Sequence, residues 1–199
     1  MGILCDGLVV TGATGHSAWY FFEKLSLENY DKKIRCLIRK GSNVEKLKNL
    51  CLDLEFLEVD FNDVDCLKSS MVGCKTVLHI ANIKLSPNVV RAGTEAGIEW
   101  FICVHTTGRY SAFKNAGAEY IAIEDSLISQ YSNLTILRPT LIYGSSSDRN
   151  LWRVIKYINS NKVFPVFGSG ENLMQPVNAE DLGLAYVKVL KNKGSCCGK

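Results

Sequence analysis

The sequence predicts a doubly wound α/β fold, in which a mostly parallel sheet carries helices on both faces. Short apolar segments alternate with amphipathic segments along nearly all of the 199 residues, a pattern typical of strands joined by helical crossovers. The first apolar segment runs directly into a turn with two glycines, Gly12 and Gly15, and then into an amphipathic segment. This length suits one α/β domain with a sizeable core and is short for two.

The strands are predicted from short runs of apolar residues that end at turn or charged residues. The first run ends at Gly12, and the second ends at the basic pair Arg39 and Lys40. Because these runs lie between amphipathic segments, we expect both faces of the sheet to be covered. In chain order, the predicted strands cover residues 7–10, 33–39, 54–59, 76–80, 100–104 and 134–137.

The helices are predicted from the amphipathic segments between these runs. One of them has Pro87 in its first turn and Gly97 just past its end, which are favoured positions for these two residues. In chain order, the predicted helices cover residues 17–27, 43–50, 63–71, 87–96, 114–130, 148–159 and 180–191.

The glycine turn carries the strongest indication of a ligand. A strand that passes through a tight turn into a helix points backbone N–H groups, and the positive end of the helix dipole, at one spot where a pyrophosphate can bind. Gly12 permits the tight turn, Gly15 permits close approach of the backbone to phosphate, and the small Ala18 lets the helix pack on the strand. We therefore expect a dinucleotide to contact Gly12, Ala13, Thr14, Gly15, His16 and Ser17.

The composition excludes several other classes. The net charge is only +3, so nothing favours a nucleic-acid or membrane partner, and no apolar run is long enough to cross a bilayer. No basic region precedes the first apolar run, so we expect no signal peptide and a cytoplasmic protein. The eight cysteines lack a CxxC spacing, which favours free thiols and predicts no metal site.

Five motifs, in order, resemble those of the short-chain dehydrogenase/reductase superfamily, in its extended or atypical branch of epimerases, dehydratases and NmrA-like proteins. They lie at residues 11–15, 59–63, 77–82, 137–144 and 175–182. The resemblance implies a Rossmann-type fold with a bound nicotinamide dinucleotide. It implies that Asp60 and Phe61 meet the adenine, that Ala81 and Asn82 lie against the cofactor, and that Pro139 and Thr140 meet the nicotinamide. The alternatives are a solvated turn with a core Phe, a close-packed strand end and a rigid turn.

The end of the second strand distinguishes the two nicotinamide cofactors. It carries no carboxylate to accept hydrogen bonds from the ribose hydroxyls of NAD, whereas Arg39, assisted by Lys40, can bind a 2′-phosphate. We therefore predict NADP(H), with NAD(H) as the alternative; a solvated basic loop is the competing interpretation.

The catalytic residues are harder to assign. The resemblance implies a Ser or Thr after the fifth strand and a Tyr-x-x-x-Lys pair; Thr106, Tyr110 and Lys114 have these identities, but the pair shares a helix face only if the helix begins by Tyr110. When Glu124 is aligned with the family's Glu, Tyr120 stands in place of the Lys and Ala116 in place of the Tyr. Three alternatives stay open: Tyr110 and Lys114 act as the pair, Tyr120 takes part in another way, or the site binds cofactor without this chemistry. Glu124 and Asp125 are expected on a solvated helix face.

Residues 1–191 are predicted to form one dinucleotide-binding domain, with small substrate flaps at 144–149 and 166–177 and a disordered tail at 192–199. The resemblance implies a reduced or truncated substrate region. We predict an NADP(H)-binding oxidoreductase or epimerase/dehydratase-type enzyme for a small or sugar-linked carbonyl or alcohol. The alternatives are a non-catalytic NmrA-like NADP(H) sensor and a truncated inactive family member. The expected partners are a small-molecule substrate and, as an alternative to a monomer, a second copy bound through the helix over 114–130.

Overall fold

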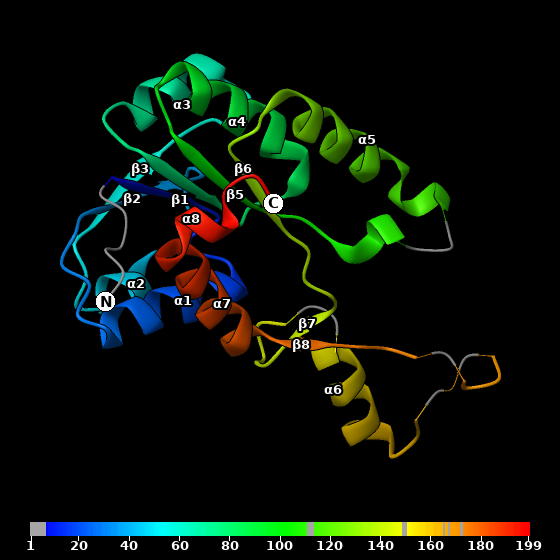
Figure 1. Cartoon of the computed structure of the whole chain (residues 1–199). Helices are drawn as coiled ribbons and strands as arrows, with labels where there is room; N and C mark the ends of the chain where they lie inside the picture. Colours follow the sequence, from blue (N-terminus) through cyan, green and yellow to red (C-terminus); the bar gives the residue numbers. More distant parts are fainter. Residues whose placement is uncertain (1–6, 111–113, 149–150, 165, 167, 172) are drawn as a thin grey trace.

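The fold is a six-stranded parallel sheet with the strand order β3-β2-β1-β4-β5-β6 (Figure 1). The computed structural model describes residues 7–110, 114–148, 151–164, 166, 168–171 and 173–199. The predicted fold class is confirmed, and all six predicted strands form. They are β1 (Leu8–Thr11), β2 (Ile34–Ile38), β3 (Leu54–Glu58), β4 (Thr76–His79), β5 (Trp100–Val104) and β6 (Leu134–Leu137).

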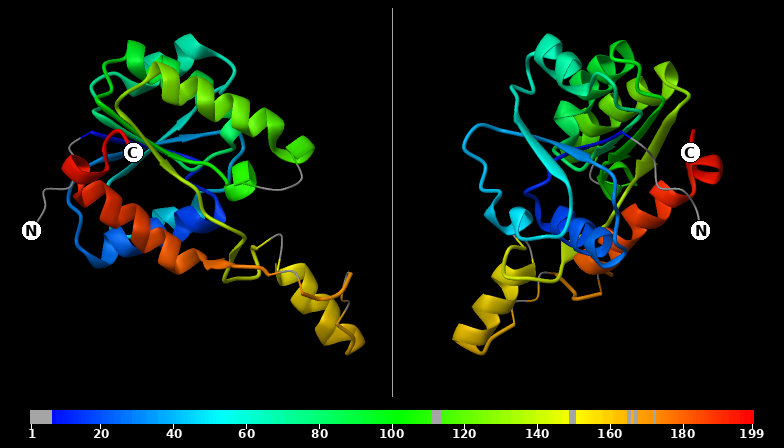
Figure 2. Two further views of the ribbon diagram at one scale, coloured as in Figure 1. Left: turned by 45° about the vertical axis from the view of Figure 1, so that its right-hand side comes forward. Right: turned by 90° about the vertical axis from the view of Figure 1, so that its left-hand side faces the viewer.

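Helices cover both faces of the sheet, as Figure 2 shows. On one face, α1 (His16–Leu27) packs closely against α7 (Ala179–Lys191). On the other face lie α3 (Val64–Met71), α4 (Ser86–Glu95) and α5 (Lys114–Gln130). A short helix, α2 (Glu45–Lys48), follows β2 and buries Leu47 in the core beneath α1.

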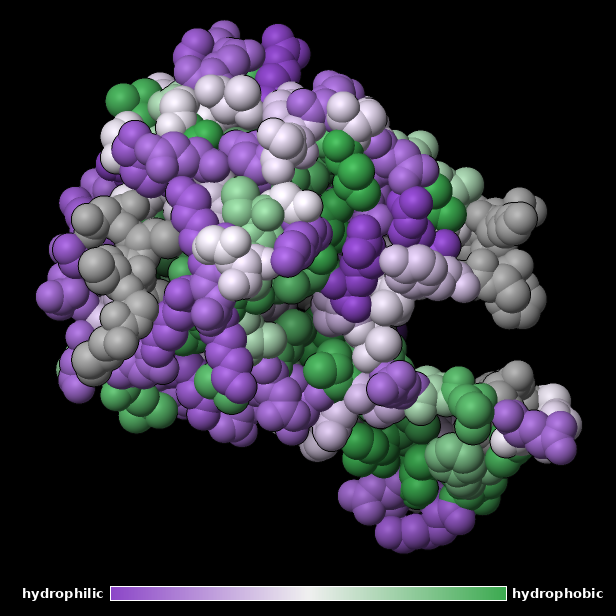
Figure 3. All heavy atoms as spheres, viewed as in Figure 1, coloured by the Kyte–Doolittle hydropathy of each residue, from purple (hydrophilic) through white to green (hydrophobic). Residues whose placement is uncertain are grey.

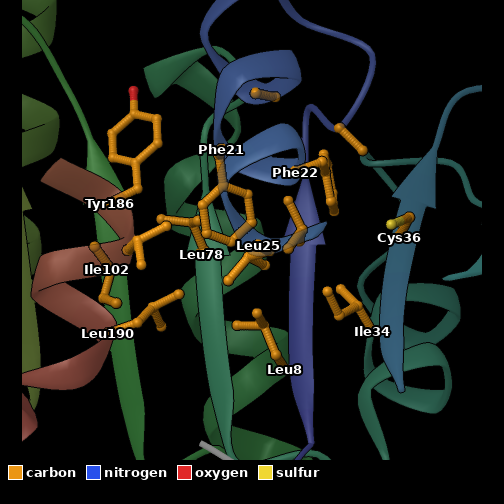
Figure 4. Close-up of a cluster of buried hydrophobic side chains, with 14 of the residues drawn as sticks. Leu8, Phe21, Phe22, Leu25, Ile34, Cys36, Leu78, Ile102, Tyr186 and Leu190 are labelled. Carbon is orange, nitrogen blue, oxygen red and sulfur yellow. The ribbon is translucent and has the colours of Figure 1, made fainter. Parts of the chain in front are cut away.

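Successive residues of β1 enter two separate cores because side chains alternate across a strand. Leu8 and Val10 pack with α1 and α7, whereas Val9 packs with α3 and α4. Figure 4 shows the first core, in which Phe21 and Phe22 of α1 are fully buried. Burial of each such side chain contributes about 2–3 kcal/mol to stability.

All six carboxyl ends of the strands lie at one edge of the sheet. The chain order reverses between β1 and β4, which are paired from Leu8 with Thr76 to Thr11 with His79. In sheets of this kind, the loops that leave two such strands diverge to opposite faces and leave a crevice between them. This arrangement places the glycine turn after β1 beside the segment after β4.

A projecting arm is the main feature that the sequence did not predict. It begins at a two-stranded sheet of β7 (Ile142–Tyr143) and β8 (Val177–Asn178) and contains α6 (Leu151–Asn161). The Asp148 carboxylate accepts a hydrogen bond from the Trp152 amide in the first turn of this helix. Figure 3 shows hydrophobic side chains gathered on it. Among them, Phe164 is 64% exposed and Leu173 is 99% exposed.

The predicted disorder of residues 192–199 is wrong, because this tail covers the outer edge of β6. Residues Lys193–Cys196 form the short helix α8. Thr135 donates a hydrogen bond from Oγ1 to the carbonyl oxygen of Cys196, at 2.6 Å, and the Ile136 amide donates to the carbonyl oxygen of Lys199, at 2.9 Å. An edge strand has unpaired backbone groups, and the tail satisfies some of them.

No helix in the described part of the chain is long and apolar enough to cross a membrane.

Candidate functional site

A row of four cavities follows the carboxyl edge of the sheet, and neighbouring cavities share wall residues. The first, of about 410 Å³, lies between the glycine turn, the first turns of α1, the region of α2 and the serines at 145–147. The second, also of about 410 Å³, joins it at Thr14 and leads to Ile80 and Ile142. The third, of about 290 Å³, begins at these two residues, and the fourth, of about 320 Å³, shares Thr106 and Pro139 with the third. Together they form one long cleft.

The glycine turn forms the first end of the cleft. Gly12 has φ +76°, a conformation that side chains disfavour, and a Cβ atom there would lie 2.7 Å from the Ala81 amide nitrogen. The Gly15 amide donates a hydrogen bond to the Gly12 carbonyl oxygen at 2.9 Å, which closes the turn. Only glycine at position 12 therefore lets the segments after β1 and β4 approach this closely.

Helix α1 begins at this turn without a side-chain cap. Gly15 occupies the N-cap position and has no side chain that could cap the helix, and the first turn contains no acidic residue. The partly positive start of the helix is therefore left for a ligand. His16 Nε2 lies 2.9 Å from Ser145 Oγ. Burial lowers the pKa of His16, so its ring is neutral and links the glycine turn to the arm by this hydrogen bond.

His79 lies beneath this end of the cleft and is fully buried. Its Nε2 lies 3.3 Å from the carbonyl oxygen of Asn82, which can only accept, so Nε2 carries the proton and donates. Nδ1 then accepts from the Thr11 hydroxyl at 2.6 Å. Burial lowers the pKa of His79 to about 4, so this histidine is a neutral structural residue.

The third cavity forms the other end of the cleft. Its wall is apolar at Ile80, Val104 and Ile142 and carries five polar side chains, those of Ser17, Asn82, His105, Thr106 and Tyr120. Such a combination of apolar wall and few polar groups is typical of a small-molecule site. The Thr106 Oγ1 accepts a hydrogen bond from the Gly108 amide at 3.1 Å, which leaves its own proton free to donate.

A buried carboxylate supports this second end. Glu124 on α5 is 1% exposed, so its predicted place on a solvated face is wrong. Its Oε1 accepts from Arg138 Nη2 at 2.8 Å and from Arg109 Nη1 at 3.1 Å, and its Oε2 accepts from His105 Nδ1 at 2.9 Å. Burial alone would raise the pKa of Glu124, but the hydrogen bonds from Arg138 and His105 outweigh burial and lower it. The charged carboxylate thus joins α5 to the ends of β5 and β6.

His105 is held as a neutral ring by this carboxylate. Burial lowers the pKa of His105, although the hydrogen bond to Glu124 acts in the opposite direction. Because Nδ1 donates to Glu124, Nε2 of the neutral ring accepts from the Ser86 hydroxyl at 3.2 Å. Ser86 is fully buried, and His105, although it lines the third and fourth cavities, has both ring nitrogens engaged in this Ser-His-Glu chain, which orients the backbone next to Thr106.

Most of the predicted site residues lie in the walls of the cleft, and some do not. Arg39, Lys40 and Asp60 are exposed and line none of the four cavities. Phe61 is 6% exposed and packs in the second core, while its carbonyl oxygen accepts from Asn88. The predicted residues found in the walls are Ala13, Thr14, Gly15, His16, Ser17, Ala81, Asn82, Thr106, Pro139 and Thr140.

The predicted pair of Tyr110 and Lys114 lies partly outside the described residues. Tyr110 ends a 3₁₀ turn over Thr107–Tyr110, is 69% exposed and lines none of the four cavities, whereas α5 begins at Lys114. Residues 111–113 and the side chain of Lys114 lie outside the described part of the structure. Tyr120 does line the third cavity.

Of the two predicted substrate flaps, only the first contributes described residues to the walls of the cleft. Within 144–149, Ser145, Ser146 and Ser147 line the first cavity, while Arg149 lies outside the described residues. No described residue of 166–177 lines any of the four cavities, and this segment runs along the arm in Figure 1.

Sequence reasoning missed several wall residues. Asn43 and Lys46 face the glycine turn across the first cavity, and Lys46 lies 5.9 Å above the ring of Trp19. Their solvated loop and short helix gave no sequence signal. For Glu124 the sequence did carry a signal: Glu124 follows Tyr120 by one helical turn, so the two residues share a helix face.

Within the described ranges, no group of three or more His, Cys, Asp or Glu residues is placed to hold a metal ion. The buried thiols of Cys36 and Cys103 have their pKa raised to about 12 by burial, which keeps them protonated and unreactive.

Comparison with known proteins shows the family to which the chain belongs. The model of the NAD dependent epimerase/dehydratase family matches residues 89–196, more than half of the chain. A subunit of Arabidopsis thaliana, NADH dehydrogenase [ubiquinone] 1 alpha subcomplex subunit 9, mitochondrial, is 25% identical over 215 aligned positions, which cover 98% of this chain and 53% of the relative. The chain therefore spans about half the length of this curated relative.

Two solved structures share the fold. The dTDP-glucose 4,6-dehydratase DesIV of Streptomyces venezuelae, with NAD and DAU bound, has a TM-score of 0.74 at 16% identity, and the match covers 96% of this chain and 73% of that one. An NADPH-dependent quinone oxidoreductase of Escherichia coli, QOR2, has a TM-score of 0.73 at 21% identity, with 92% and 63% covered. At these identities the likeness concerns the fold alone.

Proposed function

Because the chain belongs to the NAD dependent epimerase/dehydratase family, we propose that it binds a nicotinamide dinucleotide along the cleft at the carboxyl edge of its sheet. One observation carries the proposal. The glycine turn and the uncapped start of α1 open into a cavity of about 410 Å³, and a Cβ at Gly12 would fill the close approach that shapes it. This backbone cradle fits a pyrophosphate.

The two halves of the dinucleotide then lie in opposite directions from the turn. The pyrophosphate meets residues 12–17, and the nicotinamide half reaches the third cavity, between Ala81 and Asn82 on one side and Pro139 on the other. Asp60 and Arg39, at the ends of neighbouring strands, are left for the adenosine half. The adenine-stacking role expected of Phe61 is not part of this proposal, because Phe61 belongs to the core.

We assign NADP(H) as the preferred cofactor. Arg39 and Lys40 are exposed where β2 ends, and Lys46 adds a cation in the wall of the first cavity. A carboxylate does reach this turn from β3, but Glu58 there is engaged with the Gly41 amide at 3.4 Å. A 2′-phosphate would pair with these cations through charge-assisted hydrogen bonds.

The reaction that this site supports best is oxidoreduction, or an epimerase/dehydratase-type reaction, of a small or sugar-linked carbonyl or alcohol. The bound dinucleotide would supply or accept the hydride. The Thr106 hydroxyl keeps a free proton that can donate to a substrate oxygen, and the apolar wall of the third cavity excludes water from the reacting atoms.

Titration of the purified protein with NADPH and with NADH, followed by cofactor fluorescence, tests the proposal. We expect NADPH to bind at least about tenfold more tightly, since one charge-assisted pair contributes about 1.5–3 kcal/mol. Binding of neither dinucleotide would overturn the function; equal binding would overturn the NADP(H) preference alone.

A second candidate is a non-catalytic NADP(H)-binding protein. The observation that favours it is the position of Tyr110, which is 69% exposed and lines none of the four cavities. The Arabidopsis relative is itself named as a subunit of a larger complex. Tight NADPH binding without oxidation of NADPH across a panel of aldehydes, ketones and quinones supports this candidate, whereas turnover of any of them contradicts it.

A further inference from the structure

The identity of the hydroxyl that meets the nicotinamide half is the next question, and its answer rests on the proposed function. Five polar side chains line the third cavity. Four of them are already engaged in local structure. Ser17 Oγ accepts from the Tyr186 hydroxyl, and His105 bonds with Ser86 and Glu124. The Asn82 Oδ1 accepts from the Lys84 amide at 2.9 Å, and Thr106 accepts from Gly108. The fifth, Tyr120, has no hydrogen-bond partner among the described residues, and it stands in the cavity wall.

The register of α5 is what directs Tyr120 toward the cavity. Glu124, one helical turn later on the same face, is anchored by two arginines and His105. Gly117, one turn earlier, lies against the 3₁₀ turn so closely that a Cβ there would stand 2.9 Å from the Gly108 carbonyl oxygen. A helix held on both sides of Tyr120 cannot rotate this side chain away.

An ion pair ties the same turn of α5 to the segment after β4. Lys84 and Glu119 lie 2.7 Å apart. The pKa of Lys84 is raised, chiefly by its hydrogen bond to Glu119 and to a smaller extent by the nearby Tyr120 phenol. Tyr120 therefore lies close to the residues that form the floor of the nicotinamide end, Asn82 and Ile83.

From this placement, we propose that Tyr120, and not Tyr110, contacts the nicotinamide riboside half of the bound dinucleotide by donating a hydrogen bond from its hydroxyl. Among the polar side chains in the wall of this cavity, the Tyr120 phenol is the one without a hydrogen-bond partner in the described residues, and it lines the space in which that half must lie. Tyr110, in contrast, is 69% exposed and lines none of the four cavities. Tyr120 is therefore the residue that recognises the reacting end of the cofactor.

Calorimetric titrations with two ligands test this assignment without any turnover. NADP⁺ carries the nicotinamide riboside, whereas 2′-phospho-ADP lacks both the nicotinamide and its ribose and otherwise fills the same adenosine and pyrophosphate positions. For Tyr120→Phe we expect NADP⁺ to bind roughly three- to tenfold more weakly, the loss of one net hydrogen bond, with 2′-phospho-ADP unchanged within about twofold. Tyr110→Phe is the matched control, and it leaves the affinities for both ligands unchanged.

Each other outcome overturns the assignment. Unchanged NADP⁺ affinity in Tyr120→Phe, or weakening by Tyr110→Phe in its place, contradicts the role of Tyr120 while leaving the proposed function intact. Equal weakening of both ligands in Tyr120→Phe means that the side chain supports the fold and not the nicotinamide. If the wild-type protein binds neither ligand, the proposed function and this inference fall together.

Discussion

The two ends of the cleft are held in different ways. At the end built on the glycine turn, where we propose that the phosphates bind (the phosphate end), backbone shapes the site: Gly12 adopts φ +76°, and its Cα hydrogen faces the backbone of Ala81 with no room for a side chain. At the other end, where we propose that the nicotinamide half lies (the nicotinamide end), side chains shape the site: the Glu124 carboxylate holds Arg109, Arg138 and His105. A backbone-built end depends on one residue type at one position, whereas an end built from side chains depends on partners that are distant in the sequence.

The largest expected effect breaks the phosphate end. Gly12→Ala should lower the free energy of unfolding by about 4 kcal/mol, because it adds left-handed strain of about 1–2 kcal/mol and a clash of a Cβ with the Ala81 backbone. NADPH binding should be lost as the turn opens. Urea unfolding and fluorescence titration measure the two effects.

Gly41→Ala is the matched control for that substitution. Gly41 has nearly the same backbone angle, φ +75°, but a Cβ there would meet nothing within 4 Å. We expect a loss of only about 1–2 kcal/mol and unchanged folding cooperativity. Equal losses for the two glycines would mean that close packing does not shape the turn.

The next effect breaks the nicotinamide end. Glu124→Gln should lower the free energy of unfolding by about 3 kcal/mol, because it leaves the largely buried Arg138 guanidinium without its anion. Asp125→Asn is the control: this neighbouring carboxylate also pairs with Arg109, at 2.6 Å, but its side chain is 54% exposed, and we expect less than about 1 kcal/mol. A loss for Glu124→Gln as small as that for Asp125→Asn would contradict the account of the buried network.

A pH dependence follows from the two buried histidines, one at each end. The pKa of His79 is about 4 in the folded protein against 6.5 in the unfolded chain, so the unfolded state binds the proton first as the pH falls. The contribution of neutral His79 to the free energy of unfolding is fully present above pH 6.5 and decreases toward pH 4, with a loss of about 2 kcal/mol at pH 5. His105, whose pKa is also lowered, acts in the same direction.

Urea unfolding between pH 7 and pH 5 measures this loss, and a flat stability over that interval would contradict it. Side-chain nitrogen NMR sharpens the comparison, because the chain has only three histidines. We expect opposite neutral tautomers at the two ends: a proton on Nε2 of His79, which donates to Asn82, and on Nδ1 of His105, which donates to Glu124. The same tautomer for both would exclude one of these bonding patterns.

The smallest effect concerns the adenosine half. Arg39→Ala should weaken NADPH binding about tenfold and leave NADH binding unchanged, because in the proposed mode of binding the exposed guanidinium would pair with the 2′-phosphate only. Lys48→Ala serves as the control, since Lys48 is exposed nearby but pairs with Glu45 and lines none of the four cavities. Equal changes for NADPH and NADH would mean that Arg39 does not contribute to the preference for NADPH.

Sequence reasoning succeeded where local rules decide the structure. The six strands, the glycine turn and the small residue at Ala81 follow from patterns within a few neighbouring residues. It failed where a side chain finds distant partners: Glu124 looks like a surface carboxylate until Arg138 and His105 are brought beside it. The tail failed for the same reason, since its order comes from the edge of β6, which lies far away in the sequence.

A crystal structure of the protein with NADP⁺ tests the central claim most directly. We predict that the pyrophosphate lies against the backbone amides at the start of α1 and that the nicotinamide half occupies the space walled by Asn82, Thr106 and Tyr120. A complex in which the glycine turn makes no contact with phosphate, although the ligand is bound elsewhere, would contradict the account.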